Sequence, residues 1–246
     1  MPDPNLIAAI LHGAVGIGSS LWIKESYDPQ KTLISTQLLK NDGTYTQQDD
    51  WLLVKLILSF TFITALFHIA LFSFRKFREG LLARENNYLR WLEYGITSSL
   101  MLAVIGFSVG VETLQIFILI IVLNLVMILA GHMVECYLRK DRQGMVLASS
   151  IVGWSCFAVI WYWLIRAFLQ STREATQNGA KIPNFVTVVI ISMVFFFSLF
   201  GAVQLYHISH KGTYARIDRL YLLLSFLSKT ALTTLLLGGV MGRNQD

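Results

Sequence analysis

The sequence predicts an all-α membrane protein: a bundle of seven transmembrane helices, with a cytoplasmic N-terminus and a short extracellular β-hairpin between the first two helices. Three observations lead to this fold class. The chain is 54% hydrophobic and only 14% charged, whereas soluble domains average about 25% charged residues. Seven apolar runs approach the roughly 20 residues that a bilayer requires. Basic residues gather in alternate connections between these runs, which is typical of multi-pass membrane proteins.

The seven apolar runs account for most of the 246 residues and indicate a single domain, residues 1–246. The first run is short and glycine-rich, and Glu93 interrupts the third near its start. The predicted spans are residues 6–23, 51–74, 91–111, 115–136, 145–168, 185–206 and 220–241.

The lysines and arginines of the short connections set the orientation. They are more numerous after the second, fourth and sixth spans than on the opposite side. The positive-inside rule therefore places the N-terminus inside and the C-terminus outside. We interpret RKFREGLLAR, residues 75–84, as a cytoplasmic loop that could also bind anionic headgroups or a partner. The net charge of +5 is explained by topology, so nucleic acid is not expected as a partner.

The connection between residues 24 and 50 is the only long one. It contains two β-prone runs, TLISTQLL and TYTQQ, on either side of KNDG, a turn sequence. This pattern favours a hairpin outside the membrane, and an irregular loop remains the alternative.

Lys229 lies within the apolar run LLLSFLSKTALTTLLL, residues 222–237. A lysine at the centre of a span costs about 2.5–3.5 kcal/mol on insertion scales, so a function is expected for it. Its side chain is too deep to reach the interface, because about 14 Å of helix separate it from Leu220. It therefore pairs with a buried acid or forms an imine with an aldehyde. Glu93 is the best-placed acid, whereas Glu135 borders a solvated loop.

Other chemistry finds little support in the residues. Cys136 and Cys156 lie in apolar segments without metal-ligand spacing. The sequence has no nucleophile elbow, metal-spaced His/Cys cluster or phosphate-binding glycine loop, so we do not expect an enzyme. A G-protein-coupled receptor would place its N-terminus outside.

Several stretches together resemble the heliorhodopsins, retinal-binding seven-helix membrane proteins that are inverted relative to ordinary microbial rhodopsins. They are RWLEY (90–94), IPNFVTVVIISMVFFFSLFGAVQLYH (182–207) and RLYLLLSFLSKTAL (219–232), with LHGAVG and ALFHIALFSF in the first two spans. The resemblance covers essentially the whole chain and depends on the order and spacing of these stretches.

The resemblance implies that Lys229 carries all-trans-retinal covalently as a protonated Schiff base, with Glu93 as its counterion. It also implies a homodimer. Ser225, one helical turn before the lysine, would hydrogen-bond near the Schiff base. The remaining implied residues are pocket-lining Tyr94, Ser98, Phe196 and Phe197, although which ring of the run Phe195–Phe197 meets the polyene stays open, and a polar network of His12, His68, Arg90 and Glu135.

Two departures from the family pattern concern this network. Val15 stands where the family tends to have a glutamine, and LFGAVQLY lacks the asparagine favoured late in the sixth span.

The resemblance leaves the outcome of light absorption open. An ordinary microbial proton pump has an arginine and two carboxylates at fixed spacing, and an aspartate one turn before the lysine. Arg90 and Glu93 match, but Val104 and Ser225 occupy the other two positions, so pumping is not expected. The first remaining function is a photosensor that changes its cytoplasmic face for an unknown partner. The second is a light-gated proton path, for which Thr233, Thr234, Ser108 and Glu112 are the polar groups on the outer side.

Overall fold

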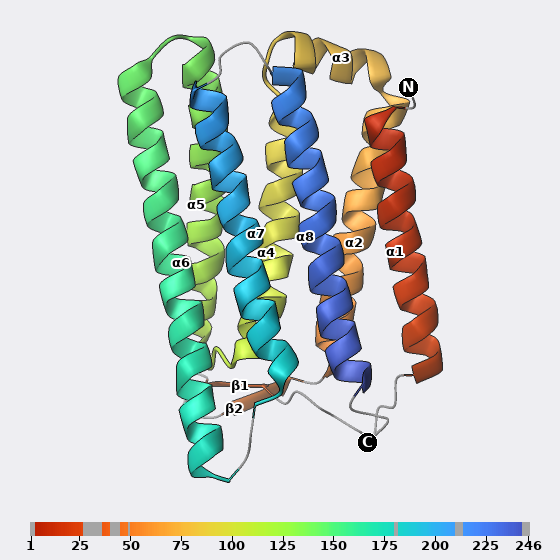
Figure 1. Ribbon diagram of the computed structural model, residues 1–246, viewed down its shortest axis with the longest axis vertical. Coiled ribbons are helices and arrows are strands. Elements are labelled where there is room, and N and C mark those ends of the chain that lie inside the picture. The colour runs from red at the N-terminus through yellow and green to blue at the C-terminus, as the bar shows by residue number, and fades with distance from the viewer. Residues whose placement is uncertain are drawn as a thin grey trace.

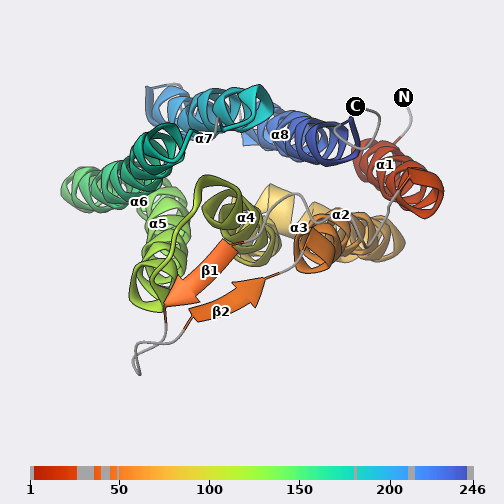
Figure 2. The same ribbon diagram turned by 90° about the horizontal axis from the view of Figure 1, so that it is seen from below.

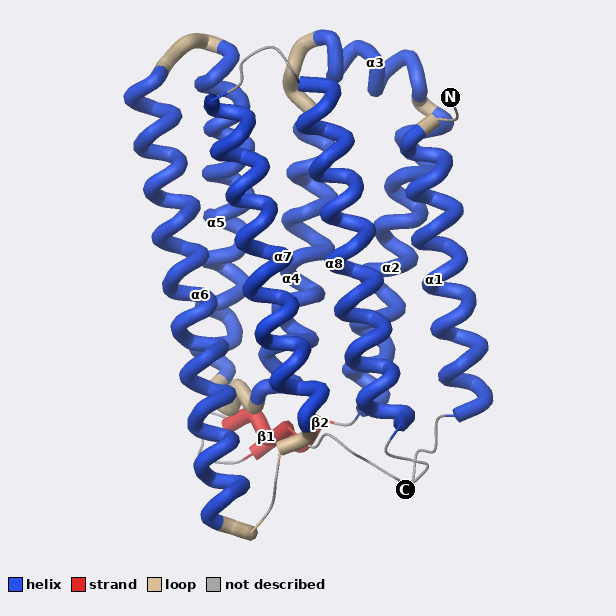
Figure 3. The backbone as a smooth tube through the Cα atoms, in the orientation of Figure 1, coloured by secondary structure: helices blue, strands red, loops and turns tan. Residues whose placement is uncertain are grey.

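The computed structural model describes residues 3–26, 36–39, 45–48, 50–179, 182–209 and 214–242. Seven helices in these ranges are long and apolar enough to cross a membrane, and each overlaps one predicted span. Figures 1 and 3 show them side by side. The helices are α1 (Pro4–Ser26), α2 (Asp50–Ser73), α3 (Arg75–Ala83), α4 (Tyr88–Val109), α5 (Leu114–Arg139), α6 (Gln143–Gln177), α7 (Asn184–Ser209) and α8 (Tyr214–Gly242), of which α3 is the short one.

The spanning helices form a closed bundle. α1 packs on α2, α2 on α4, α4 on α5, α5 on α6 and α7 on α8, and α8 returns to α1 (Figure 2). α4 also touches α6 and α7. It is the most enclosed of the seven spanning helices in the described part of the chain, with 67% of its most apolar stretch buried inside the protein. Polar residues on α4 are therefore held away from lipid.

The ends of α4 are fixed by its sequence. The side chain of Asn87 accepts a hydrogen bond from the backbone N–H of Arg90, at 3.3 Å, and so caps the first turn. At the other end Gly110 adopts a left-handed conformation with φ of +80°, which favours glycine. These caps fix where α4 begins and ends.

α3 corrects the expectation of a loop at residues 75–84. This segment is helical because Leu81 and Arg78, three residues apart on one face, are both buried against the bundle. Arg78 donates to both carboxylate oxygens of Asp3, at 2.9 and 2.6 Å, and so ties α3 to the start of α1. We call this end of the bundle the α3 end.

Two short strands occur in the long connection. β1 (Thr36–Leu39) pairs antiparallel with β2 (Tyr45–Gln48), with Thr36 opposite Gln48. The expected turn, KNDG, lies outside the described residues. The strands lie at the bundle end opposite α3, here called the hairpin end (Figure 1). α1 begins at the α3 end and α8 ends at the hairpin end, and which end faces the cytoplasm stays a prediction.

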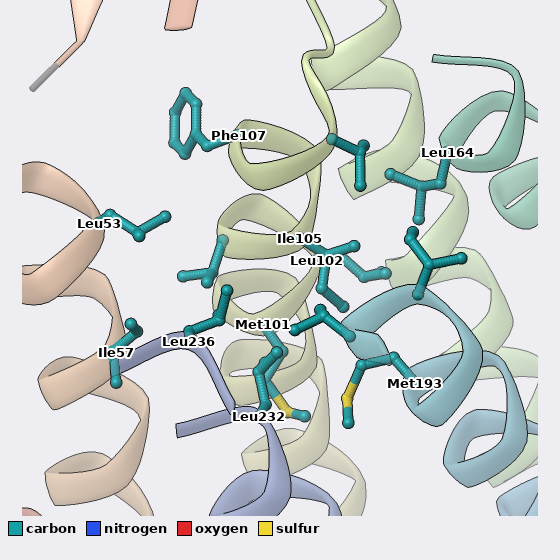
Figure 4. Close-up of a cluster of buried hydrophobic side chains, with 14 of the residues drawn as sticks. Leu53, Ile57, Met101, Leu102, Ile105, Phe107, Leu164, Met193, Leu232 and Leu236 are labelled. Atoms are coloured by element: carbon teal, nitrogen blue, oxygen red, sulfur yellow. The ribbon is translucent and has the colours of Figure 1, made fainter. Parts of the chain in front are cut away.

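An apolar cluster fills the half of the bundle toward the hairpin end. Figure 4 shows its side chains converging from several helices. Leu102 and Ile105 of α4 meet Ile57 of α2 and Leu232 and Leu236 of α8. All five are at most 1% exposed. This half of the bundle is therefore closely packed and apolar.

Candidate functional site

Lys229 and Glu93 form a buried ion pair between α8 and α4. Lys229 Nζ donates to Glu93 Oε1 at 2.5 Å, and the residues are 3% and 2% exposed. Glu93 is thus the acid that pairs with Lys229, the better placed of the two acids considered from the sequence. A lone ammonium at this depth would be costly, and the carboxylate supplies the charge that offsets this cost.

Three hydroxyl groups surround the pair. Ser225, one turn before Lys229 on α8, accepts a hydrogen bond from Nζ at 2.8 Å. Thr64 of α2 and Thr97 of α4 lie 2.8 and 3.0 Å from the same Glu93 oxygen. The carboxylate is therefore held by α2 and α8 and by a threonine of its own helix, α4. Sequence analysis missed both threonines, although Thr97 stands one turn after Glu93.

A cavity with seven aromatic rings in its wall opens beside Lys229 and extends from α8 across to α6. Its rings belong to Trp91, Tyr94, Trp154, Phe157, Phe197, Phe200 and Tyr221. Ser98, Ser225 and Lys229 also line it. Of the predicted pocket residues, Tyr94, Ser98 and Phe197 therefore lie at the cavity.

Phe196 was expected to line the pocket, but it packs against the apolar cluster and does not line this cavity. Phe195 is 59% exposed. Successive residues on a helix point about 100° apart, so one of three consecutive rings faces the cavity.

Two glycines shape the cavity walls. A Cβ atom added at Gly201 would lie 2.5 Å from the ring of Trp154, and one at Gly131 would lie 2.5 Å from the ring of Trp91. The indoles thus lie directly against backbone and leave a slot between helices. A ring-lined slot with a primary amine at one end fits a flat apolar ligand that carries an aldehyde.

His12 and His68 stack near the ion pair on the α3 side. Their ring centroids are 5.9 Å apart with 10° between the planes. His68 Nδ1 lies 2.9 Å from Asn5 Oδ1, whereas neither ring nitrogen of His12 has a hydrogen-bond partner among the described residues. The two histidines therefore meet, as expected, but without a direct hydrogen bond to Glu93.

Arg90 belongs to a second charged cluster, closer to the α3 end. It donates to Glu135 Oε1 at 2.5 Å and also to Asp218. The indole N–H of Trp91 donates to the other Glu135 oxygen at 2.6 Å. Glu135 was expected to border solvent, but it is 3% exposed because Arg90 and Trp91 bind both its oxygens.

Asp218 was missed by sequence analysis. It precedes Lys229 by three helical turns, so spacing alone could have placed both on one face of α8. A small cavity lined by Asn5, His68, Asn87, Arg90, Glu93 and Asp218 lies between the two charged groups. The predicted polar residues are thus divided into two clusters that share one cavity.

The polar groups expected toward the hairpin end do not form such a network. The hydroxyl of Thr233 is buried without a hydrogen-bond partner among the described residues. Thr234 is exposed and bonds to backbone carbonyls of its own helix, and Ser108 does the same.

Comparison with known proteins gives two findings. A family model described as Heliorhodopsin matches residues 3–241. The crystal structure of Exiguobacterium sibiricum rhodopsin is similar, with a TM-score of 0.70 and 11% sequence identity over 98% of this chain and 96% of that one. At this identity the likeness concerns the fold. A search among curated proteins gave no significant match.

Proposed function

Because the chain belongs to the heliorhodopsin family, we propose that Lys229 binds retinal as an imine and that Glu93 is the counterion of the protonated imine. The family and the fold identify a retinal photoreceptor that is an integral multi-pass membrane protein. The site of attachment, the counterion and the signalling route are the proposal. The observation that carries it is the Lys229–Glu93 pair at the wall of the aromatic cavity.

The residues around Lys229 fit this chemistry. Its primary amine would attack the aldehyde carbon, and loss of water would leave an imine. Glu93 would balance the positive charge that remains on the nitrogen. Ser225, Thr64 and Thr97 would hold the two charged groups in place. Bound retinal supplies absorption of visible light and isomerisation about a double bond.

The polar side of the pair favours a sensor that signals toward the α3 end. A change in the distance between Lys229 and Glu93 would alter the charge facing the small cavity that Glu93 shares with Arg90 and Asp218. Arg90 joins α4 to α8 through Asp218 and to α5 through Glu135. A displaced charge at Glu93 would therefore act on a contact among three helices.

Proton conduction is the weaker alternative. A path to the hairpin end would have to cross the apolar cluster around Leu102, Ile105 and Leu236, each at most 1% exposed. Val104, at the position where a pump would carry its donor carboxylate, is also completely buried in this cluster. Proton transfer needs hydrogen-bonding groups or water, which this packing excludes.

The proposal also extends to orientation and assembly. An N-terminus and an α3 end that face the cytoplasm are supported by the excess of basic residues in the connections at that end. We further propose a homodimer and an unidentified partner at the cytoplasmic face.

Visible spectra with added all-trans-retinal test the attachment and the counterion. The protein should gain a visible band, and Lys229→Ala should lack it. Glu93→Gln should shift the band or replace it with near-ultraviolet absorption, because the buried imine cation loses its partner charge. Glu135→Gln is the matched control: it removes another buried carboxylate outside the pair and should change the band far less. A visible band in Lys229→Ala, or equal changes in both glutamine variants, would contradict the assignment.

Photocurrents under voltage clamp distinguish sensor from channel. We expect no sustained light-driven current from the intact protein. A steady current that follows the proton gradient and vanishes in Lys229→Ala would instead establish conduction.

A further inference from the structure

The position of α3 fixes it at the surface of the bilayer. Only Phe74 separates the end of α2 from the start of α3. α2 crosses the membrane, so its end lies at a bilayer surface. Figure 1 shows α3 lying across that end of the bundle. A helix in this position is expected at the depth of the lipid headgroups.

One side of α3 is anchored to the protein and leaves two rings exposed. Arg78 and Leu81 are buried, and Arg78 is bound bidentately by Asp3. Phe74 and Phe77 are 68% and 51% exposed. Two adjacent uncovered phenylalanines are unusual at a water-facing surface but typical of helices that lie in a membrane interface.

Basic side chains lie next to these rings along the chain. Arg75 and Lys76 come between the two phenylalanines in the sequence and are exposed, and Arg84 is exposed just after the helix. Glu79 is the acidic residue of α3 and pairs with Arg75, with both side chains more than half exposed. The exposed surface therefore combines aromatic rings with an excess of positive charge, which complements anionic headgroups.

We propose that α3 and Phe74 form a binding site for anionic phospholipids. The rings of Phe74 and Phe77 enter the boundary between headgroups and acyl chains, and Arg75 and Lys76 bind the lipid phosphates. A phospholipid is the occupant because the helix lies at headgroup depth and its exposed rings and cations match the two parts of such a molecule. The site is independent of the retinal chemistry proposed above.

The depth of α3 gives the first test. Single cysteines at Phe77→Cys and Ala83→Cys, in a Cys136→Ala/Cys156→Ala background, would carry nitroxide labels in vesicles of phosphatidylcholine and phosphatidylglycerol. Ala83 is the matched position, because it is exposed on the same helix and its side chain points about 120° away from that of Phe77. We expect oxygen to reach the label at 77 and a water-soluble nickel chelate to reach the label at 83. Equal access of the nickel chelate to both labels would overturn the proposal and favour a water-facing surface for a protein partner.

Lipid selectivity gives the second test. Native mass spectrometry would compare phosphatidylglycerol and phosphatidylcholine retained by the protein released from these vesicles. Each basic residue near an anionic surface contributes about fivefold in affinity, so Arg75→Gln/Lys76→Gln should lower the preference for phosphatidylglycerol by up to about 25-fold. Lys140→Gln/Arg142→Gln removes the same charge from exposed positions between α5 and α6, at the same end of the bundle but away from Phe74 and Phe77, and should lower the preference much less. Equal losses in both variants, or no loss in the α3 variant, would refute a site on α3.

Discussion

Neutralising one member of the Lys229–Glu93 pair should destabilise the protein before any retinal is bound. The perturbation is Glu93→Gln, which removes the charge and keeps a side chain of similar size. Lys229 Nζ would retain Ser225 as a hydrogen-bond acceptor but would lose the carboxylate 2.5 Å away. The ammonium would then remain buried, since the lysine side chain is 4% exposed.

The size of the effect follows from burial. Breaking a buried ion pair by removing one partner costs about 3–5 kcal/mol, whereas replacing both partners with uncharged groups of similar volume is often neutral. The hydroxyls of Ser225, Thr64 and Thr97 remain, so we expect about 3 kcal/mol for Glu93→Gln. The double variant Glu93→Gln/Lys229→Met should recover most of this loss. The coupling energy between the two sites should thus reach at least about 2 kcal/mol.

Unfolding of the retinal-free protein in mixed micelles, titrated with dodecyl sulfate and followed by tryptophan fluorescence, measures this cycle. The four proteins are the parent chain, Glu93→Gln, Lys229→Met and the double variant. If the two single changes simply add to give the double, within about 0.5 kcal/mol, the pair is not coupled and its role in holding the buried charge is refuted.

Three further predictions concern the surrounding structure. Arg90→Gln should lower the free energy of unfolding in the same assay by about 3–5 kcal/mol, because two carboxylates lose a buried cation. Arg75→Gln, at an exposed pair, should cost far less, because solvent screens that pair, and equal costs would contradict the burial argument. Gly201→Ala should slow and reduce formation of the visible pigment, since its Cβ would lie 2.5 Å from an indole ring, whereas Gly153→Ala, with its nearest neighbour at 3.7 Å, should behave like the parent. Burial by itself raises the pKa of Asp3. Its hydrogen bonds and the charge of its partner Arg78 lower the pKa by more, so that it lies below the usual 3.8. This carboxylate therefore stabilises the protein above about pH 4 and ceases to do so as the pH falls through its lowered pKa. Asp3→Asn should reduce the free energy of unfolding at neutral pH, and its difference from the parent should narrow in acid. If that difference is the same at neutral pH and at pH 3, the stabilising role of the Asp3 carboxylate is contradicted.

The fold and the central pair were predictable because both depend on regular spacing. The depth of Lys229 in its span and the lean of its side chain toward the start of that helix favoured Glu93 over Glu135, and apolar run length located the seven spans. Glu135 was misjudged because sequence position shows how near a residue is to a loop, but not that Arg90 and Trp91 would enclose it. Thr64 was missed for a related reason, since its contact with Glu93 joins helices far apart in the chain.

α3 was missed as a helix because its stretch is short and strongly basic. Its basic residues were interpreted as a signal of a cytoplasmic loop. Its helical form depends on Leu81 reaching the bundle and on the tie between Arg78 and Asp3, neither of which a local pattern displays. Phe196 was assigned to the pocket wall because three consecutive identical residues do not show how α7 is rotated about its axis.

The unequal filling of the two bundle halves also has an electrical consequence. Polar groups and a cavity reach from Glu93 toward the α3 end, whereas closely packed hydrocarbon separates Lys229 from the hairpin end. A membrane voltage falls mostly across the less polarisable layer, as in a capacitor with two unlike dielectrics. Moving one full charge through 100 mV involves about 2.3 kcal/mol. A proton that shifts only among Glu93 and the groups on its polar side crosses a small part of that drop. The Lys229–Glu93 pair is thus electrically close to the α3 end, and the light response proposed for it should be nearly indifferent to membrane voltage.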